Sequence, residues 1–148
     1  MKVNIKNYTS TVSADKSISR IEAILVEMGA ERIHKGYKEG RLESISFSMK
    51  VDQNIIPFQL PAQVEVIEKI FLSQYKYRAT EVQKRNAREQ AERTAWKLIQ
   101  EWVHIQSSMI RLQQAEFLEV FLPYVYRVES QTTFFKSLKE SNYKALLN

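Results

Sequence analysis

Hydrophobic and polar residues alternate through much of the first 61 positions of the chain. Alternation with a period of two is typical of strands that have one buried face. It predicts a strand at Met1–Tyr8 and three more between Ile33 and Leu60. Pro57 lies in the last of these strands, which is therefore expected at an edge of the sheet. The turn at Asp52–Asn54 lacks the glycine that is usual in a tight hairpin.

A helix interrupts this alternation over residues 14–28. Its apolar positions recur at spacings of three and four, as one buried helix face requires: Ile18, Ile21, Leu25 and Met28. Gly29 follows directly and is expected to end the helix. The order β-α-β-β-β predicts an antiparallel sheet unit over residues 1–61, and therefore an α+β fold.

The remaining residues, 62–148, have helical spacing. We predict a short helix over residues 62–74, a long one over 80–121 that Pro123 stops, and a last one over 130–146. The long helix carries apolar residues at alternating spacings of four and three, which is a heptad pattern. Its members are Ala91, Ala95, Leu98, Trp102, Ile105, Met109 and Leu112. This heptad stripe is either core of the domain or the seam of a homo-oligomer.

Composition narrows the choice of fold and function. The 148 residues fit one domain, with an α+β half at 1–61 and a helical half at 62–148. A hydrophobic share of 44% and a charged share of 26% are typical of a chain that buries a core. The absence of cysteine excludes disulfides and thiolate metal sites, and three glycines leave little room for a phosphate-binding loop.

The sequence also lacks the residue patterns of common catalytic sites. Its two histidines are His34 and His104, and neither has a second histidine or acidic pair at the spacing of a metal site. Glu101 and His104 share a helix face, but the second copy that a di-iron bundle needs is missing. No serine elbow is present. We therefore expect no catalytic residue, no metal and no cofactor, which means that the protein is not an enzyme.

The net charge of +5 is concentrated in the first 100 residues. Two clusters there combine cations with tyrosine, a mixture that can follow phosphates and stack unpaired bases. The first, at a predicted hairpin turn, contains Lys35, Tyr37, Lys38 and Arg41. The second contains Lys76, Tyr77, Arg78, Lys84, Arg85 and Arg88. The alternative is a polar turn and a solvated helix face with Glu–Arg pairs three or four residues apart.

Several segments carry a resemblance that spans most of the chain: Ile56–Pro61, Ala91–Trp96, Glu101–Val103, Gln114–Phe117 and Phe121–Tyr124. They resemble small uncharacterised proteins of phages, prophages and mobile elements. The resemblance implies a binding protein of the anti-CRISPR type, which inhibits a host-defence ribonucleoprotein in the cytoplasm of a bacterium. The N-terminal residues, which lack the pattern of a targeting signal, give the same expectation of a cytoplasmic location.

Two alternatives remain open at this point. The protein could be a free-standing RNA- or single-stranded-DNA-binding accessory protein that uses the same basic residues. It could instead be an oligomeric structural or assembly protein, with the heptad stripe as its seam. No membrane partner is expected, because no apolar run approaches the roughly 18 residues that a spanning helix needs.

Overall fold

The computed structural model describes residues 4–148, and the contacts between residues divide the chain into two compact units. The first unit contains Met1–Ile24 and Ala62–Ile105, and the second contains Leu25–Pro61 and Gln106–Asn148. Each unit thus combines a segment from before Pro61 with one from after it, unlike the halves suggested by the sequence. That one domain holds both units stays a prediction. The α+β class is confirmed, because a three-stranded antiparallel sheet is followed by helices, one of them long.

The first unit is helical. It contains most of α1 (Ala14–Glu27), all of α2 (Val64–Leu72) and most of α3 (Glu81–Arg111). The side chains at its centre come from α1 and α3 and are almost completely buried: Ile18, Ile21, Ala91, Ala95, Trp96 and Val103. Burial of one such large apolar side chain contributes about 1.5–3 kcal/mol. These residues therefore hold α1 and the first part of α3 in one unit.

α1 forms where the sequence predicts it, and local chemistry sets both of its ends. The Ser13 hydroxyl accepts a 3.2 Å hydrogen bond from the backbone N–H of Lys16, as an N-cap serine does. At the other end Gly29 has a φ of 104°, a conformation that side chains disfavour. The N–H of Ala30 then donates to the carbonyl of Leu25 at 2.9 Å. Gly29 therefore ends the helix, as predicted.

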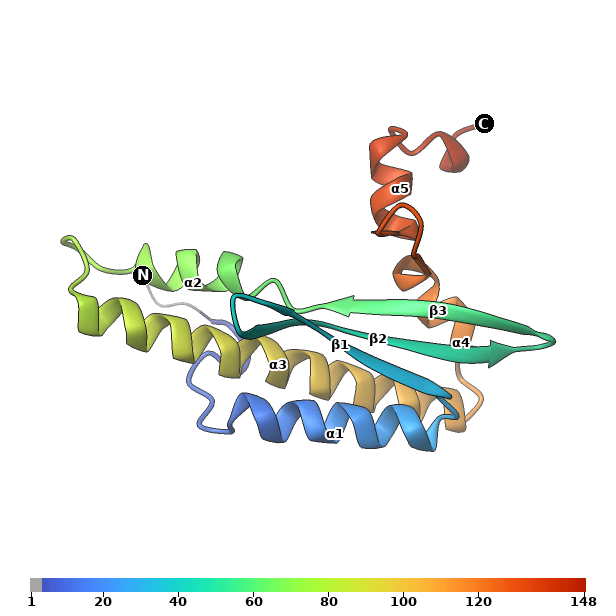
Figure 1. Ribbon diagram of the computed structural model, residues 1–148, viewed down its shortest axis with the longest axis horizontal. Coiled ribbons are helices and arrows are strands. Elements are labelled where there is room, and N and C mark those ends of the chain that lie inside the picture. Colours follow the sequence, from blue (N-terminus) through green and yellow to red (C-terminus); the bar gives the residue numbers. More distant parts are fainter. Residues whose placement is uncertain (1–3) are drawn as a thin grey trace. The chain divides into compact units, whose positions relative to one another are not determined.

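An antiparallel sheet of order β1-β2-β3 is the centre of the second unit, and Figure 1 shows its three long strands. The strands are β1 (Arg32–Lys38), β2 (Arg41–Val51) and β3 (Asn54–Pro61). Pro57 lies in β3 and pairs with Ser48 of β2. β3 is an edge strand, where a residue without an N–H is tolerated. The edge position expected of Pro57 is confirmed.

Both hairpin turns of this sheet use positive φ angles. Glu39 and Gly40 have φ angles of 53° and 76°, as the two central residues of a type I′ turn do. In the second turn Asp52 has a φ of 55°. Aspartate is one of the few residues with a side chain that adopt this region readily. Asp52 therefore takes the place of the usual hairpin glycine.

Four phenylalanine rings form the core beside the sheet. Phe47 and Phe58 are paired across β2 and β3 with ring centroids 5.3 Å apart. Phe117 and Phe121, the two ends of α4 (Phe117–Phe121), stack at 4.5 Å. The pairs meet edge to face, with 5.2 Å between Phe58 and Phe117. Each aromatic pair adds about 0.5–1.5 kcal/mol beyond its buried area, so these contacts fix α4 on the sheet.

The C-terminal part of the second unit is more broken than the predicted helix over 130–146. A 3-10 turn follows α4 and is succeeded by a short ribbon of β4 (Tyr126–Arg127) and β5 (Thr132–Thr133). Only α5 (Phe134–Glu140) is α-helical, and a 3-10 turn at Lys144–Leu146 comes after it. The prediction of one continuous helix was wrong, because consecutive positive φ angles at Asn142 and Tyr143 interrupt the helix.

The predicted strand at Met1–Tyr8 is not found in the part of the chain that the structure describes. Met1–Val3 lie outside that part, and residues 4–9 are irregular and turn. Asn7 has a φ of 65°, and both its carbonyl oxygen and its side-chain amide bond to α3. The polar groups of this segment are therefore satisfied by a helix rather than by a neighbouring strand.

The long helix is shorter than the predicted 80–121. α3 ends at Arg111, Gln113 adopts a φ of 59°, and α4 begins only after Glu116. Glu116 and Glu119 form a reciprocal capping box, which starts a new helix. Apolar spacing continues across this break, and that is why one helix was predicted. The helical stop expected just before Pro123 is confirmed, since α4 ends at Phe121.

Candidate nucleic-acid interface

The first predicted cluster lies on the β1–β2 hairpin of the second unit. Lys35, Tyr37 and Lys38 are exposed residues of β1, and 64% of Tyr37 is accessible. Arg41 begins β2 and is half-buried. Lys35, Lys38 and Arg41 already make contacts within the protein. The hairpin therefore presents one open aromatic residue, with its cations engaged.

The second predicted cluster is one stretch of the first unit, and Figure 1 shows α2 beside the first part of α3 there. Part of the cluster lies in the exposed loop after α2, and the rest in the first turns of α3. We call it the basic loop–helix surface, made of Lys76, Tyr77, Arg78, Lys84, Arg85 and Arg88. The connection predicted at Tyr75–Arg78 is confirmed.

Tyr77 is the most prominent side chain of this surface. It is 78% exposed, the highest fraction among the exposed aromatic side chains of residues 4–148. The ammonium group of Lys76 lies 5.6 Å from its ring centroid, a cation–π contact worth about 0.5–1 kcal/mol at an exposed site. The Tyr77 ring is thus exposed to solvent, with the positive charge of Lys76 beside it.

A capping box fixes the point where the loop becomes α3. The Thr80 hydroxyl accepts from the backbone N–H of Gln83 at 3.2 Å, and the Gln83 side chain accepts from the N–H of Thr80 at 2.9 Å. These two bonds satisfy donors that a helix start leaves without partners. Because the start of α3 is fixed, Lys84, Arg85 and Arg88 have set positions on its first turns.

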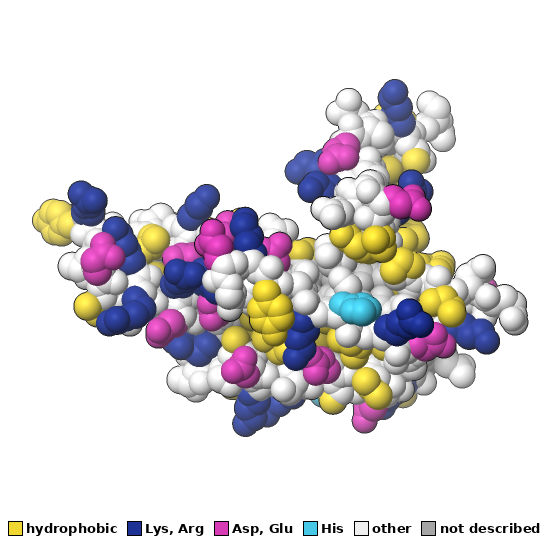
Figure 2. Space-filling view, in the orientation of Figure 1, with side chains coloured by type: hydrophobic (Ala, Val, Ile, Leu, Met, Phe, Trp, Pro, Cys, Tyr) yellow, Lys and Arg dark blue, Asp and Glu magenta, His cyan; other side chains and the backbone are white. Residues whose placement is uncertain are grey.

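Charges of both signs share this part of the unit. Figure 2 shows Lys and Arg side chains interspersed with Asp and Glu over α2 and the start of α3. Lys84 pairs with Glu81 at 3.3 Å. Within residues 4–148, the guanidinium groups of Arg85 and Arg88 have no carboxylate at ion-pair distance. These two arginines are therefore the cations of α3 that remain available to a ligand.

A hollow of about 540 Å³ lies against these arginines. Its lining combines two carboxylates, three cations and one apolar residue: Glu68, Glu81, Val82, Lys84, Arg85 and Arg88. Glu68 comes from α2, and the others come from the first turns of α3. The hollow places three basic groups around one space, with Glu81 already neutralised in part by Lys84.

A second hollow, which we call the aromatic cleft, was not anticipated from the sequence. It holds about 640 Å³ and lies between the N-terminal turn, the end of α2 and α3. Its lining is Tyr8, Thr9, Phe71, Gln74, Tyr75, Asn86, Ala87, Glu89, Gln90 and Arg93. Three separate stretches of chain contribute, so no local motif could indicate it. The one signal in the sequence is the spacing of Asn86, Gln90 and Arg93, which puts three polar residues on one helix face.

Hydrogen bonds to α3 hold the N-terminal side of this cleft in place. The Thr94 hydroxyl donates to the carbonyl of Asn7 at 2.9 Å. The side chains of Gln90 and Arg93 both donate to the carbonyl of Ser10, at 3.1 and 3.2 Å. Tyr8 lies between these anchors, so its position at the edge of the cleft is fixed from both sides.

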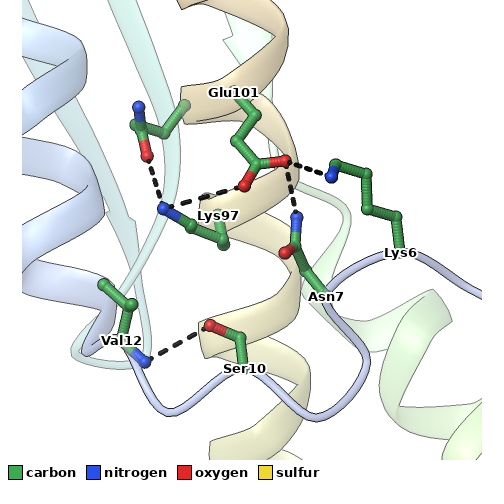
Figure 3. A network of polar contacts seen from close by, with 7 residues as sticks. Lys6, Asn7, Ser10, Val12, Lys97 and Glu101 are labelled. Carbon is green, nitrogen blue, oxygen red and sulfur yellow. Dashed lines mark hydrogen bonds and ion pairs between the residues drawn. The ribbon is translucent and has the colours of Figure 1, made fainter.

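Glu101, farther along α3, also anchors the N-terminal turn to the helix, as Figure 3 shows. Its carboxylate accepts from the Asn7 side chain at 3.1 Å and pairs with Lys6 at 3.2 Å and Lys97 at 3.7 Å. The hydrogen bond from Asn7, with smaller contributions from Lys6 and Lys97, lowers the pKa of Glu101 below 4.5, although burial opposes the shift. Glu101 is therefore an anchor that remains charged at neutral pH.

Neither histidine is part of these sites. His34 lies exposed on β1, and His104 lies exposed on α3. Within residues 4–148, no three His, Asp or Glu side chains gather as ligands of one metal ion would. Among the described helices, none combines the length and the apolar character needed to cross a membrane.

Comparison with protein-family models, with curated proteins and with solved structures finds no match to this chain.

Proposed function

We propose that the protein is a non-enzymatic binding protein that holds single-stranded RNA or DNA on the basic loop–helix surface. The observation that carries the proposal is Tyr77, a largely exposed ring with the Lys76 ammonium beside it and Arg78 next in the loop. Bases that are not paired can stack on such a ring, while the adjacent cations meet the phosphates. A duplex keeps its bases stacked inside and would leave the ring unused.

The arginines of α3 supply the second part of the argument. Arg85 and Arg88 are neighbours on the helix surface, because residues three apart face the same side. A purely solvated helix face commonly pairs its cations with carboxylates three or four residues away. Here Lys84 makes such a pair, whereas Arg85 and Arg88 do not within residues 4–148. Two unpaired guanidinium groups favour an anionic ligand over the solvated-face alternative.

The sequence resemblance to phage and mobile-element proteins supports a more specific target. We propose that the strand is RNA of a host-defence ribonucleoprotein, and that binding inhibits this effector as an anti-CRISPR protein does. The same surface would serve a free-standing RNA or single-stranded-DNA binder. The two proposals differ in whether the naked strand is sufficient for binding.

Fluorescence anisotropy with a labelled single strand of about 12 nucleotides tests the nucleic-acid proposal. Binding at about 50 mM salt should weaken as salt rises, with a log–log slope of about −0.7 for each phosphate contact. In the double variant Arg85→Glu, Arg88→Glu the affinity should fall at least about tenfold, and the slope should become less negative by about 1.4, which corresponds to two lost contacts.

A matched control separates the site from the total charge. Lys16→Glu, Arg20→Glu makes the same change in net charge at two exposed positions of α1. This control should bind almost as wild type does. Equal losses in both variants would contradict a defined surface. No binding of any strand would contradict direct recognition, and capture of a purified effector ribonucleoprotein would then have to succeed for the inhibitor proposal to stand.

A further inference from the structure

We propose that the aromatic cleft seats one nucleobase of the bound strand. The inference rests on the proposed function, because the strand on the basic loop–helix surface would deliver the base. It assigns a separate role to residues on the other side of α3. Its ligand class is a neutral heteroaromatic ring, and a purine offers the largest ring for stacking.

The size and the lining of the cleft fit such a ring. About 640 Å³ lies within the range of about 300–1,000 Å³ that is usual for small-molecule sites. Tyr8 is 44% exposed and Tyr75 is 39% exposed, and Phe71 is half-buried beside them. Aromatic surface in a concave site is thus left uncovered, and stacking of one base on an aromatic side chain contributes about 1–3 kcal/mol.

Amide groups in the cleft provide hydrogen bonds for a base edge. Asn86 is exposed, and its carboxamide makes no hydrogen bond to other residues among 4–148. Its amide offers one donor group and one acceptor, the pair that asparagine uses toward an adenine edge. The Gln74 amide nitrogen donates to the carbonyl of Ile70 at 3.3 Å, so its oxygen is the part that can accept.

The charges in the cleft favour a base over a phosphate. Glu89 and Arg93 both line it, so the opposite charges offset each other. Arg93 is also committed to the Ser10 carbonyl at 3.2 Å and to the Gln90 side chain at 2.6 Å. A carboxylate together with a guanidinium that is already hydrogen-bonded is a poor phosphate site. A neutral base suits this interior, with its phosphate outside.

The chain order connects the cleft to the basic surface. Tyr75 lines the cleft, and Lys76, Tyr77 and Arg78 follow it directly in the exposed loop. On α3, a rotation of about 100° per residue puts Asn86 and Arg88 on opposite sides of the helix. A nucleic-acid strand that passes along the loop therefore meets Tyr77 and then the cleft. Arg85 and Arg88 would bind the phosphates of the nucleotides that precede the base in the cleft.

Nuclear magnetic resonance with adenosine monophosphate and ribose 5-phosphate tests the cleft independently of strand binding. Adenosine monophosphate should shift the backbone amides of Tyr8, Thr9 and Tyr75 and the side-chain amide of Asn86. Ribose 5-phosphate, which has no base, should leave them unchanged. Identical shifts with both probes, or no shift at these residues with either, would overturn the proposal.

Variants then connect the cleft to the strand. Tyr75→Ala or Asn86→Ala should weaken an oligoadenylate about tenfold and leave an abasic strand of equal length unaffected. The exposed Tyr143→Ala, in the second unit, is the matched control and should bind both strands as wild type does. Equal weakening of the oligoadenylate and the abasic strand by Tyr75→Ala and Asn86→Ala would overturn the base site.

The failure of one proposal can be told from the failure of the other. Arg85→Glu, Arg88→Glu should weaken strand binding at least about tenfold and keep the shifts caused by adenosine monophosphate. Strand binding without those shifts would refute the base site and leave the proposed function intact. Shifts at the cleft without any strand binding would refute the proposed function, and with it the assignment of the base to a bound strand.

Discussion

The hydroxyl of Thr94 donates a 2.9 Å hydrogen bond to the backbone carbonyl of Asn7, across 87 positions of the sequence. Thr94 is completely buried and Asn7 is half-buried, so the bond is shielded from water on the side of Thr94. It ties the N-terminal turn to α3 next to the aromatic cleft, whose edge includes Tyr8 and Thr9. The stability of this turn and the shape of the cleft therefore depend on the same contact.

Thr94→Val should lower the free energy of unfolding by about 1–2 kcal/mol. Valine preserves the shape of the side chain but leaves the Asn7 carbonyl without this donor, and removing one partner of a hydrogen bond that is partly shielded from water costs about 1–2 kcal/mol. Urea denaturation measures the loss. Thr11→Val, at an exposed position of the same segment, should change stability by less than about 0.5 kcal/mol. Equal effects would show that the Thr94–Asn7 bond contributes nothing specific.

The lowered pKa of Glu101 predicts that its contribution to the free energy of unfolding depends on pH. Its pKa lies below 4.5 in the folded protein, mainly because Asn7 donates to the carboxylate. A carboxyl group whose pKa is lower in the folded state stabilises the protein above its unfolded pKa, and this contribution is lost as the pH falls through the folded value. Glu101→Gln should therefore be less stable than wild type at pH 7, by roughly 0.5–1 kcal/mol, because the ion pairs are partly exposed.

The difference between Glu101→Gln and wild type should shrink steadily below about pH 4.5. Denaturation curves recorded between neutral and acidic pH measure it. Glu140→Gln, at an exposed position of α5, serves as the control for removing one carboxylate. A difference that stays constant over the whole pH range would mean that the charge of Glu101 does not stabilise the N-terminal turn.

Elements defined by neighbouring residues could be predicted from the sequence. Gly29 ends α1 because its own backbone adopts a φ of 104°, and Pro57 belongs at a sheet edge because it lacks an N–H. Both effects depend on one residue and its immediate surroundings. The α+β class follows from the same kind of local pattern, since period two and helical spacing occupy different parts of the chain.

Features created by distant contacts could not be predicted in this way. The segment around Asn7 alternates as a strand does, but it is held as a turn by two hydrogen bonds to α3. Thr94 donates to the Asn7 carbonyl, and the Asn7 side chain donates to the Glu101 carboxylate. The aromatic cleft joins residues near 8, 74 and 90, and no spacing rule connects them. The break after Arg111 was missed for another reason. Apolar spacing continues through it, although the capping box of Glu116 and Glu119 starts a new helix there.

Ser17 offers a test of the buried face of α1. It is completely buried, and its hydroxyl makes no hydrogen bond to any residue among 4–148. Ser17→Ala should raise the free energy of unfolding by about 1–2 kcal/mol, because it removes the cost of burying an unsatisfied hydroxyl and improves helix propensity. Ser19→Ala, on the exposed side of the same helix, changes propensity alone and should gain about 0.5 kcal/mol. A Ser17→Ala variant no more stable than Ser19→Ala would mean that the buried hydroxyl costs nothing.

The heptad stripe of α3 changes character along its length. Ala91 and Ala95 are buried, so the first part of the stripe is core. Farther along, Ile105 is 56% exposed, Met109 39% and Leu112 70%. The sequence left core and subunit seam as alternatives for the whole stripe. A seam remains a proposal for the exposed end alone, because apolar residues at heptad spacing can pack against a second helix.

If Met109 and Leu112 form such a seam, the wild-type protein should self-associate as its concentration rises. Met109→Lys, Leu112→Lys should then sediment as a monomer, because two charges at the interface would have to be buried without partners. Val66→Lys, Ile70→Lys changes two exposed apolar residues of α2 that are four apart and should leave the association unchanged. Sedimentation equilibrium over a range of protein concentrations measures the association of the wild type and of both variants. A wild-type protein that stays monomeric at every concentration tested would contradict the seam, since its exposed apolar residues would then be tolerated in solvent as isolated surface residues are.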